Sequence, residues 1–380
     1  MKLIYIANIR LPTEKAHGIQ IMEMCSAFVQ SGADLTLVIP NRKNSIKEDP
    51  FGFYQIKTRF HIVRLPVIDF GSSYLAFLLT TLTFFISLFF FLLFKKGKDT
   101  VLYTRGEVAL ALVYLFPKKI FFWETHSKAD NMERYKKVID RASGVVTVTK
   151  YYGEELIKDF GLPREKLIVE SDAADVEKFD ISITKIEAQQ KLGLPTDKKI
   201  VLYKGHLYDR KGAHTLAQAA PLLRKDNIIC VFIGGTEEDV VSFKERFGKE
   251  ENVLILGNRP RQETPFYQKA SDILVIPNSA KEDNSVFYTS PIKLFSYMAG
   301  KLPIVASDLP SLREILNEEN AVFFKPDDAK DLAEKIQKVF SDDKMAQQIA
   351  NKAFLDVQDH TWVKRGQRII DFMKNSLKHD

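Results

Sequence analysis

Positively charged side chains gather in a short segment bounded by glycines, residues 204–212. An apolar strand is expected directly before it, at 200–203, and a helix directly after it, at 213–224. Ammonium and guanidinium groups at the carboxyl end of a strand supply the charge and the donors that diphosphate oxygens bind. A solvated basic loop is the alternative interpretation. The cations are Lys204, His206, Arg210 and Lys211.

A second candidate anion site is the start of the helix expected at 291–300. Ser290 is expected to cap this helix, with Pro291 as its first residue. The free N–H groups and partial positive charge of a helix start attract anions, and Lys293 adds a full charge one turn in. Pure capping is the alternative. The expected contacts are Thr289, Ser290, Ile292 and Lys293.

The turn at Gly234 and Gly235 is a weaker signal of the same kind. It follows an expected strand at 228–233 and precedes an expected helix at 238–247, so its backbone N–H groups could meet a phosphate or a base. A plain turn is the alternative. No G-x-G-x-x-G follows the first strand and no G-x-x-x-x-G-K-[ST] occurs, which counts against a dinucleotide oxidoreductase and a P-loop enzyme.

Glu124 and His126 leave the end of an apolar strand expected at 120–123. A carboxylate and an imidazole at a strand's carboxyl end can move protons or hold a hydroxyl by hydrogen bonds. A buried structural histidine is the alternative interpretation.

An uncharged run of 21 residues, Tyr74–Phe94, is long enough as a helix to cross a bilayer. Three interpretations compete: a transmembrane span, a buried crossover helix, and a helix that packs on the sheet with one face and enters one leaflet with the other. A span conflicts with strands expected on both sides of it, because one parallel sheet cannot be divided by a bilayer.

Thr80, Thr83 and Ser87 form one stripe of small hydroxyl residues on this helix. Such a stripe suits packing on protein and leaves the Phe and Leu faces for lipid. Basic residues near the helix would attract anionic lipid, and residues 1–128 carry 16 Lys and Arg against 9 Asp and Glu. The expected membrane contacts are Phe84, Phe85, Phe89, Phe90, Lys95 and Lys96.

The composition of the 380-residue chain is that of a globular protein, with 45% hydrophobic and 27% charged residues. A net charge of +6 is too small for a dedicated nucleic-acid binder. Two distant cysteines, Cys25 and Cys230, exclude a disulfide scaffold and fit a reducing compartment.

Strand-like and helix-like segments alternate along both halves of the chain, which predicts two parallel sheets covered on both faces. The first half has expected strands at 3–7, 35–40, 60–65, 101–104, 120–123 and 145–149, and helices at 18–30, 74–94, 107–116 and 129–142. The second half has further expected strands at 253–256, 273–276 and 304–306, and helices at 263–269 and 310–317. A polar connection at 181–198 is the expected domain boundary, and 361–378 is an expected amphipathic helix.

Together these segments resemble the retaining glycosyltransferases of the GT-B fold, especially glycosyltransferase family 4, over essentially the whole chain. Ser290–Gly300 is similar to that family's donor-binding signature and is the most specific match. The other matching segments are the acceptor-side loop that ends at Gly18, the Glu124-Thr-His126 triplet, the diphosphate loop Gly205–Gly212 and the C-terminal helix that begins near Trp362.

The resemblance implies an α/β fold of the GT-B type, with two doubly wound Rossmann-like domains facing across a cleft. Residues 1–185 would form the acceptor-side domain, which the C-terminal helix 361–378 rejoins. Residues 196–360 would form the nucleotide-sugar domain.

The implied reaction moves a sugar with retention from a nucleotide-diphosphate donor, without a metal. Arg210 and Lys211 would neutralise the leaving diphosphate, and His126 would position the sugar or the acceptor; these three are the expected catalytic residues. The expected nucleotide-sugar contacts are Gly18, His206, Gly234, Gly235, Arg259, Thr289, Ser290, Ile292, Lys293 and Ser296.

One part of the family pattern is missing. The family's Glu-x7-Glu pair falls on Tyr288 and Ser296, and the second acid usually contacts the donor ribose. Glu282 and Asp283 lie just upstream and could substitute for the first acid. The alternatives are therefore a catalytically impaired GT-B-like binding or scaffold protein, or a nucleotide-sugar epimerase.

The implied partners are a UDP- or GDP-linked sugar, which is a substrate rather than a cofactor, and a glycan or polyprenyl-linked acceptor. An anionic membrane surface is a third expected partner, and no nucleic acid is expected. The chain would lie on the cytoplasmic face of a membrane as a peripheral or monotopic protein, in surface polysaccharide or glycolipid synthesis.

Overall fold

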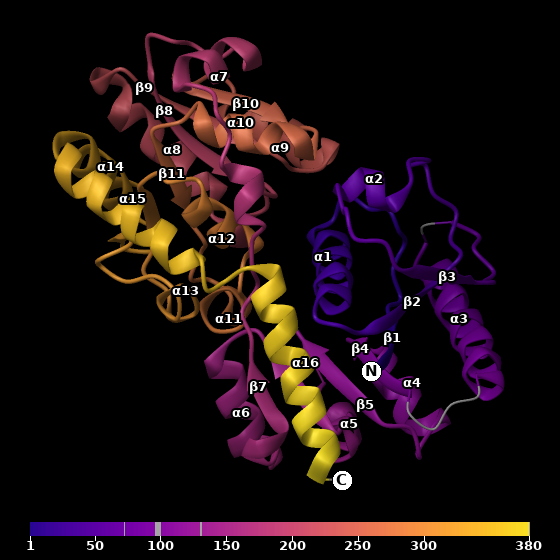
Figure 1. Cartoon of the computed structure of the whole chain (residues 1–380). Coiled ribbons are helices and arrows are strands. Elements are labelled where there is room, and N and C mark those ends of the chain that lie inside the picture. Colours follow the sequence, from indigo (N-terminus) through magenta and orange to yellow (C-terminus); the bar gives the residue numbers. More distant parts are fainter. Residues whose placement is uncertain (72, 96–99, 130, 380) are drawn as a thin grey trace. The chain divides into compact units, whose positions relative to one another are not determined.

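The computed structural model describes residues 1–71, 73–95, 100–129 and 131–379. The chain forms two compact units (Figure 1). Unit 1 comprises Met1–Ser171 and the C-terminal segment that begins at Trp362, and unit 2 comprises Asp172–Thr361. Each unit is built on a parallel sheet with helices between the strands, so the prediction of two Rossmann-like domains is confirmed.

The sheet of unit 1 has seven strands among the described residues, in the order β3-β2-β1-β4-β5-β6-β7. The order reverses between β1 and β4, and ligands of doubly wound folds bind beside such a reversal, at the carboxyl ends of the strands. The elements are β1 Lys2–Ile6, α1 Ala16–Gln30, β2 Asp34–Pro40, α2 Pro50–Tyr54, β3 His61–Leu65, α3 Tyr74–Phe94, β4 Thr100–Arg105, α4 Val108–Leu115, β5 Phe121–Thr125, α5 Lys136–Arg141, β6 Gly144–Thr147, α6 Lys150–Phe160, β7 Leu167–Val169 and α16 Trp362–His379.

The sheet of unit 2 has six strands in the described residues, in the order β10-β9-β8-β11-β12-β13, and reverses between β8 and β11. The elements are α7 Lys185–Leu192, β8 Lys199–Lys204, α8 Ala213–Leu223, β9 Ile228–Ile233, α9 Glu237–Phe247, β10 Val253–Gly257, α10 Thr264–Lys269, β11 Ile273–Ile276, α11 Asp283–Val286, α12 Ile292–Ala299, β12 Ile304–Ser307, α13 Pro310–Arg313, β13 Val322–Phe324, α14 Ala329–Ser341 and α15 Asp343–Val357.

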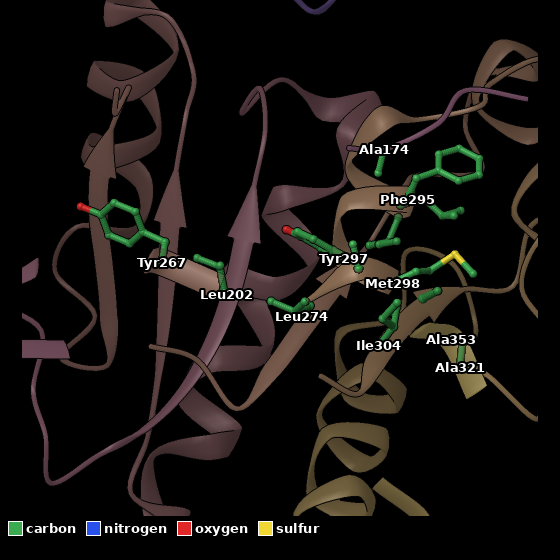
Figure 2. Close-up of a cluster of buried hydrophobic side chains, with 14 of the residues drawn as sticks. Ala174, Leu202, Tyr267, Leu274, Phe295, Tyr297, Met298, Ile304, Ala321 and Ala353 are labelled. Carbon is green, nitrogen blue, oxygen red and sulfur yellow. The ribbon is translucent and has the colours of Figure 1, made fainter. Parts of the chain in front are cut away.

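The central strands of unit 2 are buried because helices cover both faces of the sheet. All six residues of β9 are buried, as are all four of β11, which explains their continuous apolar sequences. On one face α12 packs against β8, β11 and β12: Figure 2 shows Phe295, Tyr297 and Met298 in one cluster with side chains from those strands. This packing fixes where α12 begins, and α12 carries part of the candidate site.

The boundary between the units differs from the expected one at 181–198. The chain leaves unit 1 after Ser171, and Ala174 is already part of the apolar cluster under α12 (Figure 2). The Ala174 N–H donates to the His360 carbonyl at 3.0 Å. The expected connection instead contains α7, which Gln189 ties to the Ala270 carbonyl at 3.1 Å. Its polar composition reflects an exposed helix face rather than a linker.

The C-terminal helix α16 belongs to unit 1 and packs against α1. Trp362, Ile369 and Met373 are buried on one side of it. Gly366 lies so close to α1 that an added Cβ would sit 2.7 Å from the Ala27 Cβ. The last helix of the described chain therefore completes the core of the unit that the first strand begins.

Candidate functional site

Two loops meet at the strand-order reversal of unit 2, one after β8 and one after β11. Gly212 has φ +69°, and a Cβ added there would lie 1.6 Å from the Pro277 carbonyl oxygen. The Ser279 N–H donates to the Arg210 carbonyl at 3.2 Å. The glycine-bounded segment 204–212 therefore lies where a doubly wound sheet binds its ligand.

The loop after β9 closes the same edge. Gly234 and Gly235 have φ values of +107° and +87°, a conformation that side chains rarely adopt. A Cβ on Gly234 would approach the Gly205 carbonyl oxygen to 2.5 Å. The glycine pair thus permits two loops to touch at the carboxyl end of the sheet.

Three lysines from different elements converge at this edge: Lys204 at the end of β8, Lys211 in the loop after it, and Lys293 in α12. Both Lys204 and Lys211 act electrostatically on Lys293. The Lys293 ammonium nitrogen is buried and, among the described residues, has no hydrogen-bond partner. It lies 4.5 Å from the centroid of the Tyr203 ring. Holding three ammonium groups close together, with that of Lys293 buried, costs free energy when no anion is bound. A bound anion would offset this cost.

The pKa values of all three ammonium groups are lowered. Burial, followed by the charges of Lys211 and Lys204, brings the pKa of Lys293 well below its ordinary value. Burial and Arg261 lower the pKa of Lys204 to about 7. Burial and Arg210 lower the pKa of Lys211 to about 8, although Glu282 opposes the change. A bound diphosphate would offset these effects by stabilising the charged forms.

The start of α12 differs from the expected one by one residue. Pro291 is the N-cap, with no capping side-chain hydrogen bond, and the helix begins at Ile292. The Ser290 hydroxyl instead accepts a hydrogen bond from the Asp172 N–H at 2.9 Å. The predicted Ser290 cap is therefore wrong, because that hydroxyl fixes the segment entering unit 2.

Ser296, at the position of the missing acid, lies buried beneath Lys204. Its hydroxyl oxygen accepts a hydrogen bond from Lys204 Nζ at 2.9 Å, and the hydroxyl donates to the Lys293 carbonyl at 2.9 Å. The next residue, Tyr297, accepts the Lys204 backbone N–H at 2.7 Å. Replacement of an acid by Ser296 therefore leaves Lys204 without a carboxylate there.

The other predicted donor contacts in unit 2 vary in their surroundings. His206 stacks on Tyr208 with ring centroids 5.0 Å apart and lies 3.7 Å from Asp239. Arg259 is exposed; it is Arg261, which sequence reasoning missed, that acts electrostatically on Lys204. The Thr289 hydroxyl donates to the Asn284 carbonyl at 2.6 Å.

The two suggested substitute acids, Glu282 and Asp283, are exposed at the start of α11. Glu282 acts electrostatically on the lysine cluster, because its negative charge favours the protonated form of Lys211. Within the described residues, no group of three or more His, Cys, Asp or Glu side chains could hold a metal ion.

Unit 1 has its own polar cluster at the carboxyl ends of β4 and β5. The fully buried Glu124 carboxylate lies 2.8 Å from His126 Nε2 and accepts hydrogen bonds from the Tyr103 hydroxyl at 2.6 Å and Gln20 Nε2 at 3.1 Å. Arg105 donates to the Gln20 side-chain oxygen. Of these partners, Gln20 and Arg105 carry no sequence signal that distinguishes them from surface polar residues.

An arginine from α16 completes this cluster. Arg365 is fully buried, and its Nη2 lies 2.6 Å from Glu124 Oε1. Burial alone would raise the pKa of the Glu124 carboxyl, but the charge of Arg365 and the interaction with His126 outweigh it and hold the pKa well below its ordinary value. The carboxylate is therefore ionised beside His126 at neutral pH.

Gly18, a predicted donor contact, has a packing reason to be glycine. A Cβ there would lie 2.2 Å from the Tyr54 hydroxyl oxygen. That hydroxyl donates to the Thr13 carbonyl at 2.7 Å, and its oxygen lies 2.7 Å from the Thr13 nitrogen. Tyr54 thereby holds the loop before α1 closely against Gly18.

The hydroxyl stripe of α3 faces protein, as the sequence predicts. Thr80 donates to the Ile68 carbonyl at 3.0 Å, Thr83 accepts the Ile68 N–H at 3.1 Å, and Ser87 donates to the Pro66 carbonyl at 2.6 Å. β1 and β4, which precede and follow α3 in sequence, are hydrogen-bonded neighbours. A span that separates them across a bilayer is incompatible with this sheet.

The other side of α3 is exposed. By length and composition it is the one described helix that could cross a membrane, yet only 22% of its most apolar window is buried, which contradicts a buried crossover helix. Leu82, for example, is 55% exposed. We call the exposed side the α3 apolar face; it comprises Leu75, Leu78, Leu79, Leu82, Ile86, Phe90, Leu93 and Phe94.

The predicted lipid contacts divide between the two sides of α3. Phe90 and Lys95 are exposed. Phe84 is fully buried in the core, so its prediction as a membrane contact is wrong. Phe85 is half-buried, and Phe89, also half-buried, stacks on Phe116 at 5.4 Å. Lys96 lies outside the described residues.

The comparisons with known proteins agree with this geometry. Residues 184–356 match the family model of glycosyl transferases group 1. An uncharacterized glycosyltransferase of Methanocaldococcus jannaschii is 27% identical over 262 residues, which cover 66% of this chain and 65% of that protein. The chain spans between 56% and 65% of the lengths of the first three curated relatives.

Solved structures resemble the whole chain. Sucrose-phosphate synthase from Thermosynechococcus elongatus has a TM-score of 0.79 at 16% identity, with all of both chains covered. HepE of Anabaena, in complex with UDP, has a TM-score of 0.75 at 16% identity and covers 99% of this chain and 100% of its own. The match to the family model of glycosyl transferases group 1 is confined to residues 184–356, and the chain as a whole has the GT-B fold of two Rossmann-like domains.

Proposed function

We propose that this protein is a glycosyltransferase that uses a nucleotide-diphosphate sugar, with UDP or GDP as the nucleotide. The observation that carries the proposal is the lysine cluster of unit 2. One of its buried ammonium groups, that of Lys293, has no hydrogen-bond partner in the described part of the chain. The cluster lies at the strand-order reversal of a domain that matches the group 1 family model. Structures similar to this one include HepE with UDP.

The proposed step breaks the bond between the anomeric carbon and a diphosphate oxygen and forms a bond from that carbon to the acceptor oxygen. The diphosphate oxygen gains negative charge as its bond to the anomeric carbon breaks. The acceptor's proton then passes to the departing diphosphate. Lys211, Lys293 and Arg210 stabilise this charge as fixed cations, a role that requires no metal ion. Retention of configuration is proposed on the resemblance to family 4.

The proposed acceptor is a lipid-linked or membrane-proximal glycan. The α3 apolar face, with the exposed Lys95 at its end, supports a chain that lies on an anionic cytoplasmic membrane surface as a peripheral or monotopic protein. Synthesis of surface polysaccharide or glycolipid is the process proposed for it.

The test uses Lys211→Met and Lys293→Met in the full chain, with the exposed Lys225→Met as the matched control. Sugar release and transfer are measured over a panel of UDP- and GDP-sugars, and binding by the rise in unfolding temperature. We expect both cluster variants to lose binding and turnover while the control keeps them. Normal turnover by both cluster variants would overturn the proposal.

A second candidate is a nucleotide-binding protein without catalysis, favoured by Ser296 and the buried Tyr288 in place of the two acids. Binding of a nucleotide with no transfer, hydrolysis or epimerisation for any donor on the panel would support it. One productive donor would exclude it.

A further inference from the structure

The C-terminal helix brings a fully buried arginine into the unit 1 cluster, 241 positions from its carboxylate partner. Arg365 Nη2 donates to Glu124 Oε1 at 2.6 Å, and its Nε donates to the Ser171 carbonyl at 2.8 Å. Nη2 also lies 3.1 Å from the Glu170 carbonyl, and Nη1 lies 2.8 Å from the Met24 sulfur. The guanidinium is thus fixed on all of its nitrogens.

Such a pair is a poor source of stability. Desolvation of two buried charges cancels much of their attraction, and an apolar pair of the same volume often serves the fold equally well. The position of this pair suggests another reason for it. The same Glu124 oxygen that meets Arg365 also lies 2.8 Å from His126 Nε2. The Gln20 amide nitrogen, which donates to that oxygen, lies 2.6 Å from His126 Nε2 and 3.5 Å from Nδ1. His126 follows β5 at the carboxyl end of the sheet.

We propose that Arg365 is a positioning residue for His126 and acts through Glu124. By keeping the carboxylate ionised and oriented, Arg365 makes it a charged acceptor for the proton on His126 Nε2, in competition with the neutral Gln20 amide that approaches the same nitrogen. The imidazole is then held in the tautomer whose Nδ1 carries a lone pair. A ring fixed in this way can accept a hydrogen bond from a sugar or acceptor hydroxyl at Nδ1. This inference rests on the proposed function for its substrate, but the tautomer itself does not.

The competing explanation is that Arg365 only anchors α16 to the rest of unit 1. The chain contains a matched control variant for this structural role. Arg368, one turn further along α16, makes two hydrogen bonds to the Glu170 carboxylate, at 2.7 and 2.8 Å. It anchors α16 to the same segment as Arg365 without touching Glu124 in any contact described. Arg368→Gln therefore loosens the helix without changing the charge beside His126.

The experiment measures the ¹⁵N chemical shifts of the His126 ring in the full chain, with His126→Gln to assign the signals. Wild type and Arg368→Gln should show a protonated Nε2 and an unprotonated Nδ1. Arg365→Lys, which keeps the charge but not the fork of donors, should show a mixed tautomer. Because Arg365→Met leaves a buried charge unpaired and risks unfolding, the neutral pair Glu124→Gln with Arg365→Met replaces it, and this variant should lose the tautomer while keeping the fold.

The kinetic arm uses whichever donor the panel identifies. We expect Arg365→Lys to lower kcat by about tenfold, as loss of a supporting contact commonly does, with UDP or GDP binding unchanged because the lysine cluster proposed to hold the diphosphate lies in unit 2. Unchanged tautomer in Arg365→Lys and in the neutral pair would overturn the inference. If no donor is productive, the proposed function fails, and the nitrogen shifts still decide this inference independently.

Discussion

Lys293 sets the chemical character of the unit 2 site. Its ammonium group is buried against the Tyr203 ring, with Lys204 and Lys211 near enough to lower its pKa. Aromatic contact compensates only part of the cost of burying the charge. A bound anion would offset the rest of this burial cost. Anion binding at this site should therefore depend on pH, because pH sets the charge of the lysines.

Donor binding should therefore weaken as the pH rises. With pKa values of about 7 for Lys204 and about 8 for Lys211, both are charged at pH 6 and largely neutral at pH 9, and a bound anion shifts both pKa values upward. We expect UDP-glucose, whose diphosphate has no ionisation in this range, to lose about tenfold or more in affinity between these values. Calorimetry at pH 8 in two buffers of different ionisation enthalpy should detect proton uptake on binding. A flat pH profile would contradict this.

The contact of Gly212 with Pro277 predicts a steric effect at the same edge. Gly212→Ala should destabilise unit 2 by about 1–3 kcal/mol beyond the left-handed strain and weaken UDP binding, since the two loops must separate. Gly193→Ala is the control, because Gly193 also has positive φ, +65°, but has nothing within 4 Å of an added Cβ. Urea unfolding measures both. Equal losses in the two variants would exclude a steric cause.

Sequence reasoning at this scale succeeded where the partners are local. Lys211 and Lys293 each follow a recognisable glycine or helix-start pattern, and the structure brings them together. The role of Arg365 could not be predicted from local sequence, because its partner Glu124 lies 241 positions away. The residues next to Arg365 in sequence are typical of an exposed polar helix face. The prediction of Arg259 did not include Arg261, because side-chain directions in a loop follow no regular period.

At the scale of elements, α3 shows what composition can and cannot predict. Its bounds, Tyr74–Phe94, are those of the uncharged run. Its exposed side could not be predicted from hydrophobicity, which is high all around the helix. The hydroxyl stripe of Thr80, Thr83 and Ser87 did identify the protein-facing side, because hydroxyls need acceptors when buried. Phe84 lies on that protein-facing side and was misassigned for this reason.

The α3 apolar face should bind membranes. Leu82→Ser, Ile86→Ser and Phe90→Ser combined should reduce cosedimentation with vesicles of phosphatidylcholine and phosphatidylglycerol by at least about tenfold, because each apolar side chain contributes about 1.5–3 kcal/mol when buried. Removing the anionic lipid or raising the salt should weaken binding by wild type as well.

The control for this prediction replaces exposed apolar side chains that lie outside α3. Leu222, Val241 and Leu355 are equally exposed but lie in unit 2, and changing all three to Ser should leave vesicle binding intact. Wild-type protein that never cosediments would refute the membrane assignment, and the α3 apolar face would then require another partner.

For the whole molecule, alternation of strands and helices was enough to predict two doubly wound units. It was not enough to place their boundary, because Asp172–Phe179 has no regular periodicity and is held by tertiary contacts such as that of Ala174. The short strand β7 also lacked a clear signal, because it has three half-buried residues and no alternation.

Unit 2 should fold and bind nucleotide without unit 1. It is continuous in sequence from Asp172 to Thr361, and apolar clusters cover both faces of its sheet. We expect this fragment to unfold cooperatively in urea and to gain thermal stability with UDP, whereas the fragment 196–361, begun at the expected boundary, should be less stable because it lacks Ala174 and α7. Equal stability of the two fragments would contradict the boundary found here.

Because α16 packs in unit 1, the order of synthesis affects how the two units fold. N-terminal domains usually fold first as a chain leaves the ribosome. Here the nascent unit 1 holds an unneutralised Glu124 and an uncovered α1 until Arg365 and its helix have been translated, whereas unit 2 is complete by Thr361. Unit 2 can therefore fold before unit 1 is complete, and unit 1 stays accessible to chaperones and proteases until α16 has been translated.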